Sequence, residues 1–158
     1  MSNYVATVVW TRAADAPFKD NKYSRAHEWR FDGGAVVKAS SAPASVKVPL
    51  SDPTAVDPEE ALVAAVSSCH MLFFLSYAAM AGLVIDRYED EAVGEMGKNA
   101  NGKTAIVKVT LRPKITWVGA PASAQQLDEL HHKSHEHCYV ANSVSAQIVV
   151  EPREGGGL

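Results

Sequence analysis

Two cysteines, Cys69 and Cys138, are the residues of this 158-residue chain that are best suited to covalent chemistry. They lie far apart in the sequence, form no CxxC pair and follow no signal-peptide pattern at the N-terminus. We therefore expect a cytoplasmic protein with free thiols, not a secreted domain stapled by disulfides. A free cysteine is only a few per cent thiolate at neutral pH, and the thiolate is the nucleophile. A reactive thiol thus requires a neighbour that stabilises its anion.

One arginine close to Cys69 would be sufficient to favour the thiolate. Cys69 is predicted to lie in the middle of a helix, where the helix dipole gives no help. A guanidinium about 4 Å from the sulfur supplies about 4 kcal/mol at an effective dielectric constant near 20. Arg25 is the best candidate, because strand alternation places it on the inward face of a predicted strand. Arg30 falls on the polar face of the same strand.

A carboxylate is expected to hold this arginine in place through a bidentate ion pair. Glu59 and Glu60 are the candidates, because they begin the helix that carries Cys69. Ten helical residues rise about 15 Å, so Glu59 cannot reach Cys69 along one straight helix. Cys69, the arginine and the carboxylate are therefore expected to come together through folding or across a dimer interface.

The segment from Asp57 to Gly82 is predicted to be one long helix that positions Cys69. Asp57 can cap the first turn, Pro58 suits the first helical position, Glu60 completes a capping box and Gly82 supplies a left-handed stop. The helix is apolar around its whole circumference, which requires burial in a protein core or in lipid. Polar residues interrupt the apolar run and no basic residue precedes it, so we predict a central core helix and no membrane span.

Alternation of apolar and polar residues predicts strands on both sides of this helix. The expected elements are a strand over 4–10, a polar loop over 12–24, a hairpin with strands over 25–31 and 35–40, the helix, strands over 84–96 and 104–117, a second helix from Ser123, and a strand over 144–151. Gln126 closes a capping box for the second helix, whose apolar stripe directs Cys138 inward. Residues 153–158 are expected to form a flexible tail.

These elements predict an α+β fold, in which a mostly antiparallel sheet packs on a long central apolar helix and a second helix. A chain of this length can form one domain, over residues 1–158, that buries roughly 70% of its unfolded surface. One sheet covers only one side of the central helix, so the other side requires a second covering surface. We therefore predict a homodimer, in which small side chains let a second helix approach: Ala61, Ala64, Ala65, Ser68, Ala78 and Ala79.

Two segments place the cysteines in a specific sequence context. The first is D-P-E-E-A-L-V-A-A-V-S-S-C-H at residues 57–70, and the second is H-E-H-C-Y-V-A-N-S-V at residues 135–144. They resemble the signature of the osmotically inducible protein C and organic hydroperoxide resistance (OsmC/Ohr) family, in which a N/D-P-E-x-L-like helix start precedes a reactive cysteine by ten residues. The order and separation of the segments agree with the family, and the resemblance covers roughly residues 4–151.

The resemblance implies a thiol peroxidase that acts on organic hydroperoxides. Cys69 would be the peroxidatic thiolate, and Cys138 the resolving thiol that forms a disulfide with it. Arg25 would activate Cys69 and polarise the peroxide, and Glu59 would orient Arg25. The resemblance also implies an intertwined homodimer and reduction by a dithiol such as a dihydrolipoyl group, with no bound cofactor. Tyr139 stands after the second cysteine, where family members with peroxidase activity usually carry proline.

A histidine-rich run offers a different class of function, metal binding. His131 and His135 are four residues apart and Cys138 follows three residues later, a spacing that could hold zinc with Cys69 or His70 as the fourth ligand. A solvated helix face explains these histidines more simply. His70 itself is expected to be a hydrogen-bonded core or interface histidine and not a base.

A third class of function is a non-catalytic module that binds an apolar ligand in a pocket around Phe73 and Phe74. Nucleic acid is not an expected partner, because the net charge of −3 and the isoelectric point near 6.0 provide no clustered positive field. Peroxidase activity that depends on Cys69 would separate the enzyme from the binding module.

Overall fold

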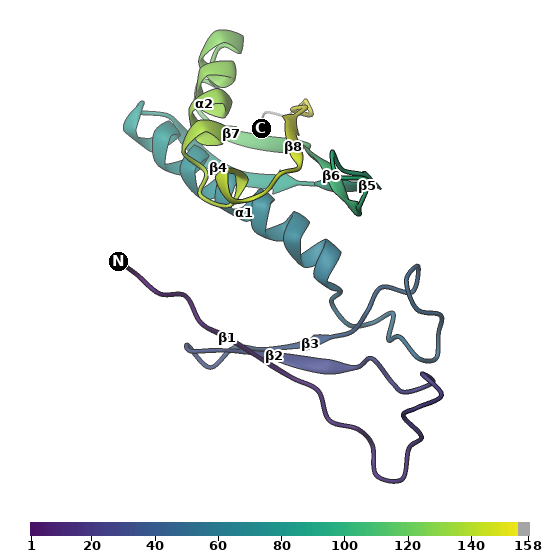
Figure 1. The fold of residues 1–158 in the computed structure, drawn as a ribbon. Helices are drawn as coiled ribbons and strands as arrows, with labels where there is room; N and C mark the ends of the chain where they lie inside the picture. The colour runs from purple at the N-terminus through teal and green to yellow at the C-terminus, as the bar shows by residue number, and fades with distance from the viewer. Residues whose placement is uncertain (155–158) are drawn as a thin grey trace. The chain divides into compact units, whose positions relative to one another are not determined.

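A computed structural model of the chain describes residues 1–154, which divide into a first compact unit, residues 1–61, and a second unit that begins at residue 62. Two α-helices and eight strands in mainly antiparallel pairs confirm the α+β class for the described residues (Figure 1). Sequence reasoning predicted one domain, and that remains a prediction. The two units are described in turn.

The first unit contains an antiparallel sheet with strand order β1-β2-β3. The strands are β1 (Ala6–Val9), β2 (His27–Phe31) and β3 (Val36–Ala39), so the predicted hairpin is present with shorter strands. Gly34 adopts a φ of 89° in the turn between β2 and β3, a conformation that favours glycine. The loop between β1 and β2 is ordered by mutual contacts of the Trp10, Phe18 and Tyr23 rings, with centroids 4.7 to 5.8 Å apart.

Helix α1 (Pro58–Met80) begins and ends where its sequence signals predict. The Asp57 carboxylate accepts a hydrogen bond from the Glu60 amide, and the Glu60 carboxylate accepts one from the Asp57 amide, each at 2.8 Å. These reciprocal bonds satisfy two amides that the first turn would otherwise leave unpaired. At the other end, Gly82 takes the left-handed conformation with a φ of 76°.

In the single chain, α1 is buried along one face only. Its buried residues recur every fourth position along one face, while residues such as Ala65, Ser68 and Leu72 are exposed. The buried set is Val66, His70, Phe74 and Ala78. Leu72 alone retains 61% of its accessible surface, a large exposure for an apolar side chain. Strands of the second unit and α2 therefore cover one face of this apolar helix.

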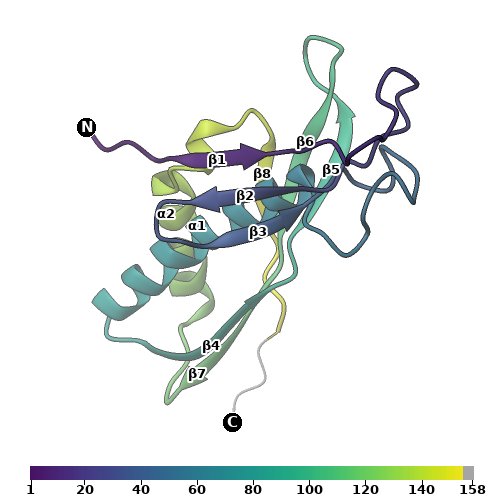
Figure 2. The same cartoon turned by 90° about the horizontal axis from the view of Figure 1, so that it is seen from below.

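The second unit contains two sheets. Strands β4 and β7 form an antiparallel pair, and the other sheet has the order β5-β6-β8, with β8 parallel to β6. Figure 2 shows β4 and β7 continuing into β5 and β6 as one long bent ribbon. The strand bounds are β4 (Val84–Asp90), β5 (Val93–Lys98), β6 (Thr104–Leu111), β7 (Pro113–Val118) and β8 (Gln147–Val150).

Two single strands predicted over 84–96 and 104–117 are therefore each two strands. Asp90 stands at the bend, where one carboxylate oxygen accepts the Arg112 amide at 2.6 Å and the other accepts the Ser67 hydroxyl of α1. This side chain takes the place of a strand partner for the Arg112 amide. The ladder is thus interrupted without leaving this donor unpaired.

Helix α2 (Ala124–His137) begins with the predicted capping box between Ser123 and Gln126. A short 3₁₀ helix (Ala141–Ser143) follows α2 and leads into β8. Two apolar clusters hold the second unit together. One joins both helices to β4 and β7 around Phe74 and Leu130, and the other joins the first half of α1 to β6 and β8 around Val66 and Leu111.

Arg153, the first residue of the predicted C-terminal tail, is bonded within the second unit. Arg153 donates to the carbonyl oxygen of Arg112 at 2.7 Å and forms an ion pair with Glu91 at 3.1 Å. Residues 155–158, the rest of the predicted tail, lie outside the described residues.

Candidate functional site

The two cysteines meet in the second unit, at the junction of α1 with the end of α2. Cys69 lies in the middle of α1 and is partly exposed, whereas Cys138 caps the C-terminal end of α2 and is fully buried. Both are free thiols, and the Cys69 side chain lies close enough to Cys138 to raise the pKa of that thiol. The two thiols therefore meet across 69 residues of sequence, with the partly exposed thiol as the one that a reagent can reach.

Cys138 is held in the protonated form. Burial, followed by the side-chain hydrogen bond with Cys69, raises the pKa of Cys138 to about 11. Its position at the C-terminal end of a helix also disfavours a negative charge. At neutral pH Cys138 is therefore a protonated thiol.

The turn after α2 fixes the backbone of Cys138. The Asn142 side chain donates to the carbonyl oxygens of Glu136 and Cys138 at 2.9 and 3.0 Å, and the Asn142 amide also donates to Cys138 at 3.0 Å. The Ala141 amide approaches the Cys138 sulfur at 3.4 Å. These bonds satisfy carbonyls that the end of α2 would leave unpaired. The sulfur is consequently presented from a well-ordered turn.

A pair of buried histidines lies beside the thiols. His70, next to Cys69 in α1, contacts His131 of α2 through a ring-nitrogen hydrogen bond of 3.0 Å, and the rings stack 5.3 Å apart. Burial lowers the pKa of His70 to about 4 and that of His131 to about 3. Both rings are therefore neutral at pH 7. The expectation that His70 is a hydrogen-bonded core histidine is confirmed.

Arg25 lies in the first unit, just before β2, and is held by local contacts. Its guanidinium donates to the carbonyl oxygen of Tyr23 and to Asn21, and lies 3.7 Å from the centre of the Tyr23 ring. These partners are oxygens and an aromatic face, so the positive charge is not neutralised by them. Arg30, the other arginine considered, pairs with Glu28 at 2.9 Å on the exposed face of β2.

Glu59 lies in the first turn of α1 and does not pair with Arg25 within the described residues. Its Oε2 atom is buried and has no hydrogen-bond partner there. An unpaired buried carboxylate oxygen is costly, so Glu59 is suited to receive a donor such as a guanidinium. Glu60, the alternative carboxylate, is used by the capping box.

The described residues contain no group of three or more ligand side chains that could hold a metal ion. The Nδ1 atom of His131 is used in the hydrogen bond with His70. Of the two residues expected to line an apolar pocket, Phe74 is fully buried in the core and Phe73 is half-buried. These findings leave the thiol pair as the best-formed chemical site.

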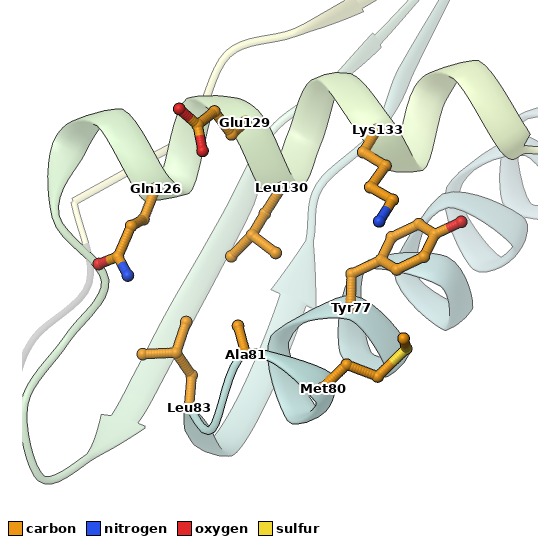
Figure 3. A pocket seen from close by; sticks show the side chains of 8 residues that line it. All are labelled: Tyr77, Met80, Ala81, Leu83, Gln126, Glu129, Leu130 and Lys133. Atoms are coloured by element: carbon orange, nitrogen blue, oxygen red, sulfur yellow. The ribbon is translucent and has the colours of Figure 1, made fainter.

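A separate hollow lies between the C-terminal half of α1 and the first half of α2. It has a volume of about 390 Å³, and eight residues line it: Tyr77, Met80, Ala81, Leu83, Gln126, Glu129, Leu130 and Lys133 (Figure 3). The Lys133 ammonium lies 4.3 Å from the centre of the Tyr77 ring. Because Tyr77 is eight residues after Cys69, about 12 Å along the helix, the hollow is distinct from the thiol site.

Comparison with known proteins identifies the family. The family model for OsmC-like proteins matches residues 51–153, so the chain belongs to the OsmC-like family. An OsmC-like protein of unknown function from Vibrio cholerae has 51% identity and a TM-score of 0.95, over 97% of this chain and 100% of that chain. No curated protein matches the chain.

Two more distant structures share the fold. An organic hydroperoxide resistance protein from Elizabethkingia anophelis has a TM-score of 0.69 at 16% identity, covering 100% of this chain and 98% of that chain. An organic hydroperoxide resistance protein, OsmC, from Legionella pneumophila has a TM-score of 0.64 at 12% identity, covering 99% and 98%. At these identities the similarity establishes the fold and supports the predicted resemblance.

Family membership also bears on assembly and on α1. Proteins of the OsmC family are generally dimeric and soluble. By length and composition, α1 is the one helix of the described residues that could cross a membrane, a test that core helices of soluble proteins also pass. The exposed apolar face of α1 in the single chain agrees with a helix that a partner subunit covers.

Three side-chain contacts at these sites were not predicted from the sequence. Tyr23 supports the Arg25 guanidinium, His131 pairs with His70, and Phe73 contacts the ring of Tyr139. The sequence did indicate that His70 and His131 are buried, since each is a polar residue on the apolar face of its helix. The contact of Tyr23 with Arg25 depends on an irregular loop, which has no periodic pattern.

Proposed function

We propose that this protein is a thiol peroxidase that reduces organic hydroperoxides. The observation that carries the proposal is the side-chain contact between Cys69 and Cys138, a partly exposed sulfur beside a buried protonated thiol. Structural free cysteines are usually buried singly and are inert, whereas redox-active cysteines are accessible and stand next to a resolving thiol. The family membership, with relatives named for organic hydroperoxide resistance, supports the same reaction.

The reaction divides into two balanced steps. The Cys69 thiolate attacks the outer peroxide oxygen, the O–O bond breaks, and the alkoxide takes a proton to leave as an alcohol, while Cys69 becomes a sulfenic acid. The Cys138 thiol then attacks the sulfenic sulfur, and a disulfide and water are formed. An external dithiol, which could be a dihydrolipoyl group, returns both sulfurs to thiols by exchange.

Arg25 and Glu59 complete the proposed site. The guanidinium of Arg25 would stabilise the Cys69 thiolate and the developing alkoxide, and Glu59 would hold that guanidinium. The buried, unpartnered oxygen of Glu59 and the absence of any carboxylate partner for Arg25 within residues 1–154 support this pairing. Since the two do not pair within one chain, we propose that the site closes across the interface of an intertwined homodimer in the cytoplasm.

Hydroperoxide consumption by single-residue variants tests the proposal. With cumene hydroperoxide and excess dihydrolipoamide, we expect Cys69→Ser to abolish turnover and Ser68→Ala, an exposed neighbour on α1, to retain it. Arg25→Met should lower the second-order rate by at least tenfold, because about 4 kcal/mol of anion stabilisation is removed. Turnover by Cys69→Ser at the wild-type rate would show that the protein is not a cysteine peroxidase.

A further inference from the structure

We propose that Tyr139 is a positioning residue for the thiol pair: its ring contact with Phe73 holds Cys138 within bonding reach of Cys69. The Tyr139 ring meets the Phe73 ring edge to face, with centroids 5.2 Å apart and planes at 87°. This is the favoured geometry for two aromatic rings. The inference deepens the proposed function, because it rests on the two cysteines acting as a redox pair.

Three consecutive residues of the turn contact one face of α1. Cys138 meets Cys69, Tyr139 meets Phe73 one helical turn later, and Val140 packs against the core cluster that contains Val66. Positions 66, 69 and 73 share a face of a helix because they follow a three- and four-residue spacing. The two sulfurs are thus flanked by one apolar contact on each side.

The other bonds of the turn fix its shape and not its distance from α1. The Asn142 side chain bonds Glu136 and Cys138, and the Ser143 hydroxyl donates to the Tyr139 carbonyl oxygen at 2.7 Å, all within residues 136–143. Three residues of this turn have side chains that contact α1 or its core cluster: Tyr139, Val140 and His137, whose ring lies 5.9 Å from that of Tyr77 and 6.5 Å from that of Phe73. Of these, Tyr139 keeps 73% of its accessible surface.

This exposure makes the contact separable from folding. Replacing a fully buried ring leaves a cavity and costs several kcal/mol, whereas an exposed ring that makes one edge contact leaves none. A Tyr139→Ala protein is therefore expected to fold, with its turn less firmly held against α1. Looser positioning lowers the effective concentration of one thiol at the other, and with it the equilibrium constant for closing the disulfide.

The test is the equilibrium of the thiol pair with dithiothreitol, in the full chain and without peroxide. The protein dithiol passes two electrons and two protons to oxidised dithiothreitol, which gives the protein disulfide and reduced dithiothreitol. An aromatic contact of this kind corresponds to about a two- to tenfold change in an equilibrium constant. We expect Tyr139→Ala to lower the constant by that factor and Tyr139→Phe, which keeps the ring, to restore it.

The partner ring gives a second measurement. Phe73→Leu should lower the same constant, and the double variant should be no worse than the poorer single variant, because Phe73→Leu already removes the contact with Tyr139 together with those to Tyr77 and His137. Melting temperatures identify any variant that fails to fold. A change below twofold in Tyr139→Ala, an equal defect in Tyr139→Phe, or additive effects in the double variant would overturn the proposal.

The two proposals fail in different ways. If cumene hydroperoxide oxidises Cys69 no faster than it oxidises a free cysteine, the peroxidase proposal fails, and the dithiothreitol equilibrium still decides the role of Tyr139. If the peroxidase proposal holds, Tyr139→Ala should leave the rate of Cys69 sulfenic acid formation unchanged and slow disulfide closure. A loss in both steps alike would instead indicate general disruption of the site and overturn the positioning role.

Discussion

The buried pair of His70 and His131 should make the stability of this protein fall steeply below pH 6.5. Both rings lie between α1 and α2, retain 1% and 4% of their accessible surface, and share one hydrogen bond. Burial is the main cause of their lowered pKa values, about 4 and about 3, and the charge of each neighbouring histidine adds to it. An unfolded chain releases both rings to water, where a histidine has a pKa near 6.5.

The direction and the size of this loss of stability follow from proton linkage. Because the folded pKa values are the lower ones, the unfolded state binds more protons below pH 6.5, and stability is lost as the pH falls toward about 4. At pH 5 each unfolded histidine gains about 2 kcal/mol from protonation, since 1.5 pH units at about 1.4 kcal/mol per unit separate pH 5 from its pKa. The two histidines therefore lower the free energy of unfolding by about 2 to 4 kcal/mol when the pH falls from 7 to 5. The lowered pKa values of Asp52 and Glu89 act in the same direction only at lower pH.

Urea unfolding followed by circular dichroism at pH 7 and pH 5, at one fixed protein concentration, measures this loss. His131→Asn should remove about half of the difference between the two pH values, because one titrating ring is gone. His132→Asn is the matched control, since His132 is exposed on the same helix and should leave the difference unchanged. The reasoning is refuted if the wild-type protein loses less than 1 kcal/mol, or if His131→Asn loses as much as the wild type.

Three further predictions concern the elements around the thiols. Asp57→Ala should lower the free energy of unfolding by about 1 kcal/mol, measured by urea titration, because it removes the cap of α1; no change would mean that water replaces the cap. Gly94→Ala should lower the melting temperature, because a Cβ there would lie 2.6 Å from the Val63 side chain, and Val63→Ala should relieve the defect in the double variant. An additive loss would point to a different cause. Cys138 in the reduced protein should resist iodoacetamide up to about pH 9, because burial and the bond with Cys69 raise its pKa, and rapid alkylation at pH 7 would contradict that assignment.

Much of the fold was predictable because local signals and the final packing agree. The capping boxes at Asp57 and Ser123 begin helices where they should, and Gly82 ends the first helix in a left-handed conformation. The presence of antiparallel strands on both sides of α1 followed from apolar alternation. Such signals act over three or four residues, so they are legible in one sequence.

The features that sequence reasoning missed depend on contacts between distant segments. The break between β4 and β5 is stabilised by Asp90, which bonds Ser67 and Arg112 from elsewhere in the chain. The pairing of His70 with His131 likewise requires two helices to pack in one register. Neither contact leaves a periodic trace, because periodicity records only which face of an element is apolar.

The candidate site was predicted unevenly for the same reason. The meeting of Cys69 and Cys138 in the second unit agrees with the two sequence segments that carry them. The local setting of Arg25, above the Tyr23 ring and without a carboxylate, was not predicted, because it depends on an irregular loop. The roles of Arg25 and Glu59 in the reaction therefore remain predictions that the variants above can test.

Mass spectrometry of the reduced protein after one equivalent of cumene hydroperoxide tests the central claim most directly. We predict a loss of two hydrogens and a single cross-linked peptide pair that joins Cys69 to Cys138. In Cys138→Ser, the same treatment should give a sulfenic acid on Cys69 that dimedone traps. Recovery of both cysteines as unmodified thiols would contradict the account.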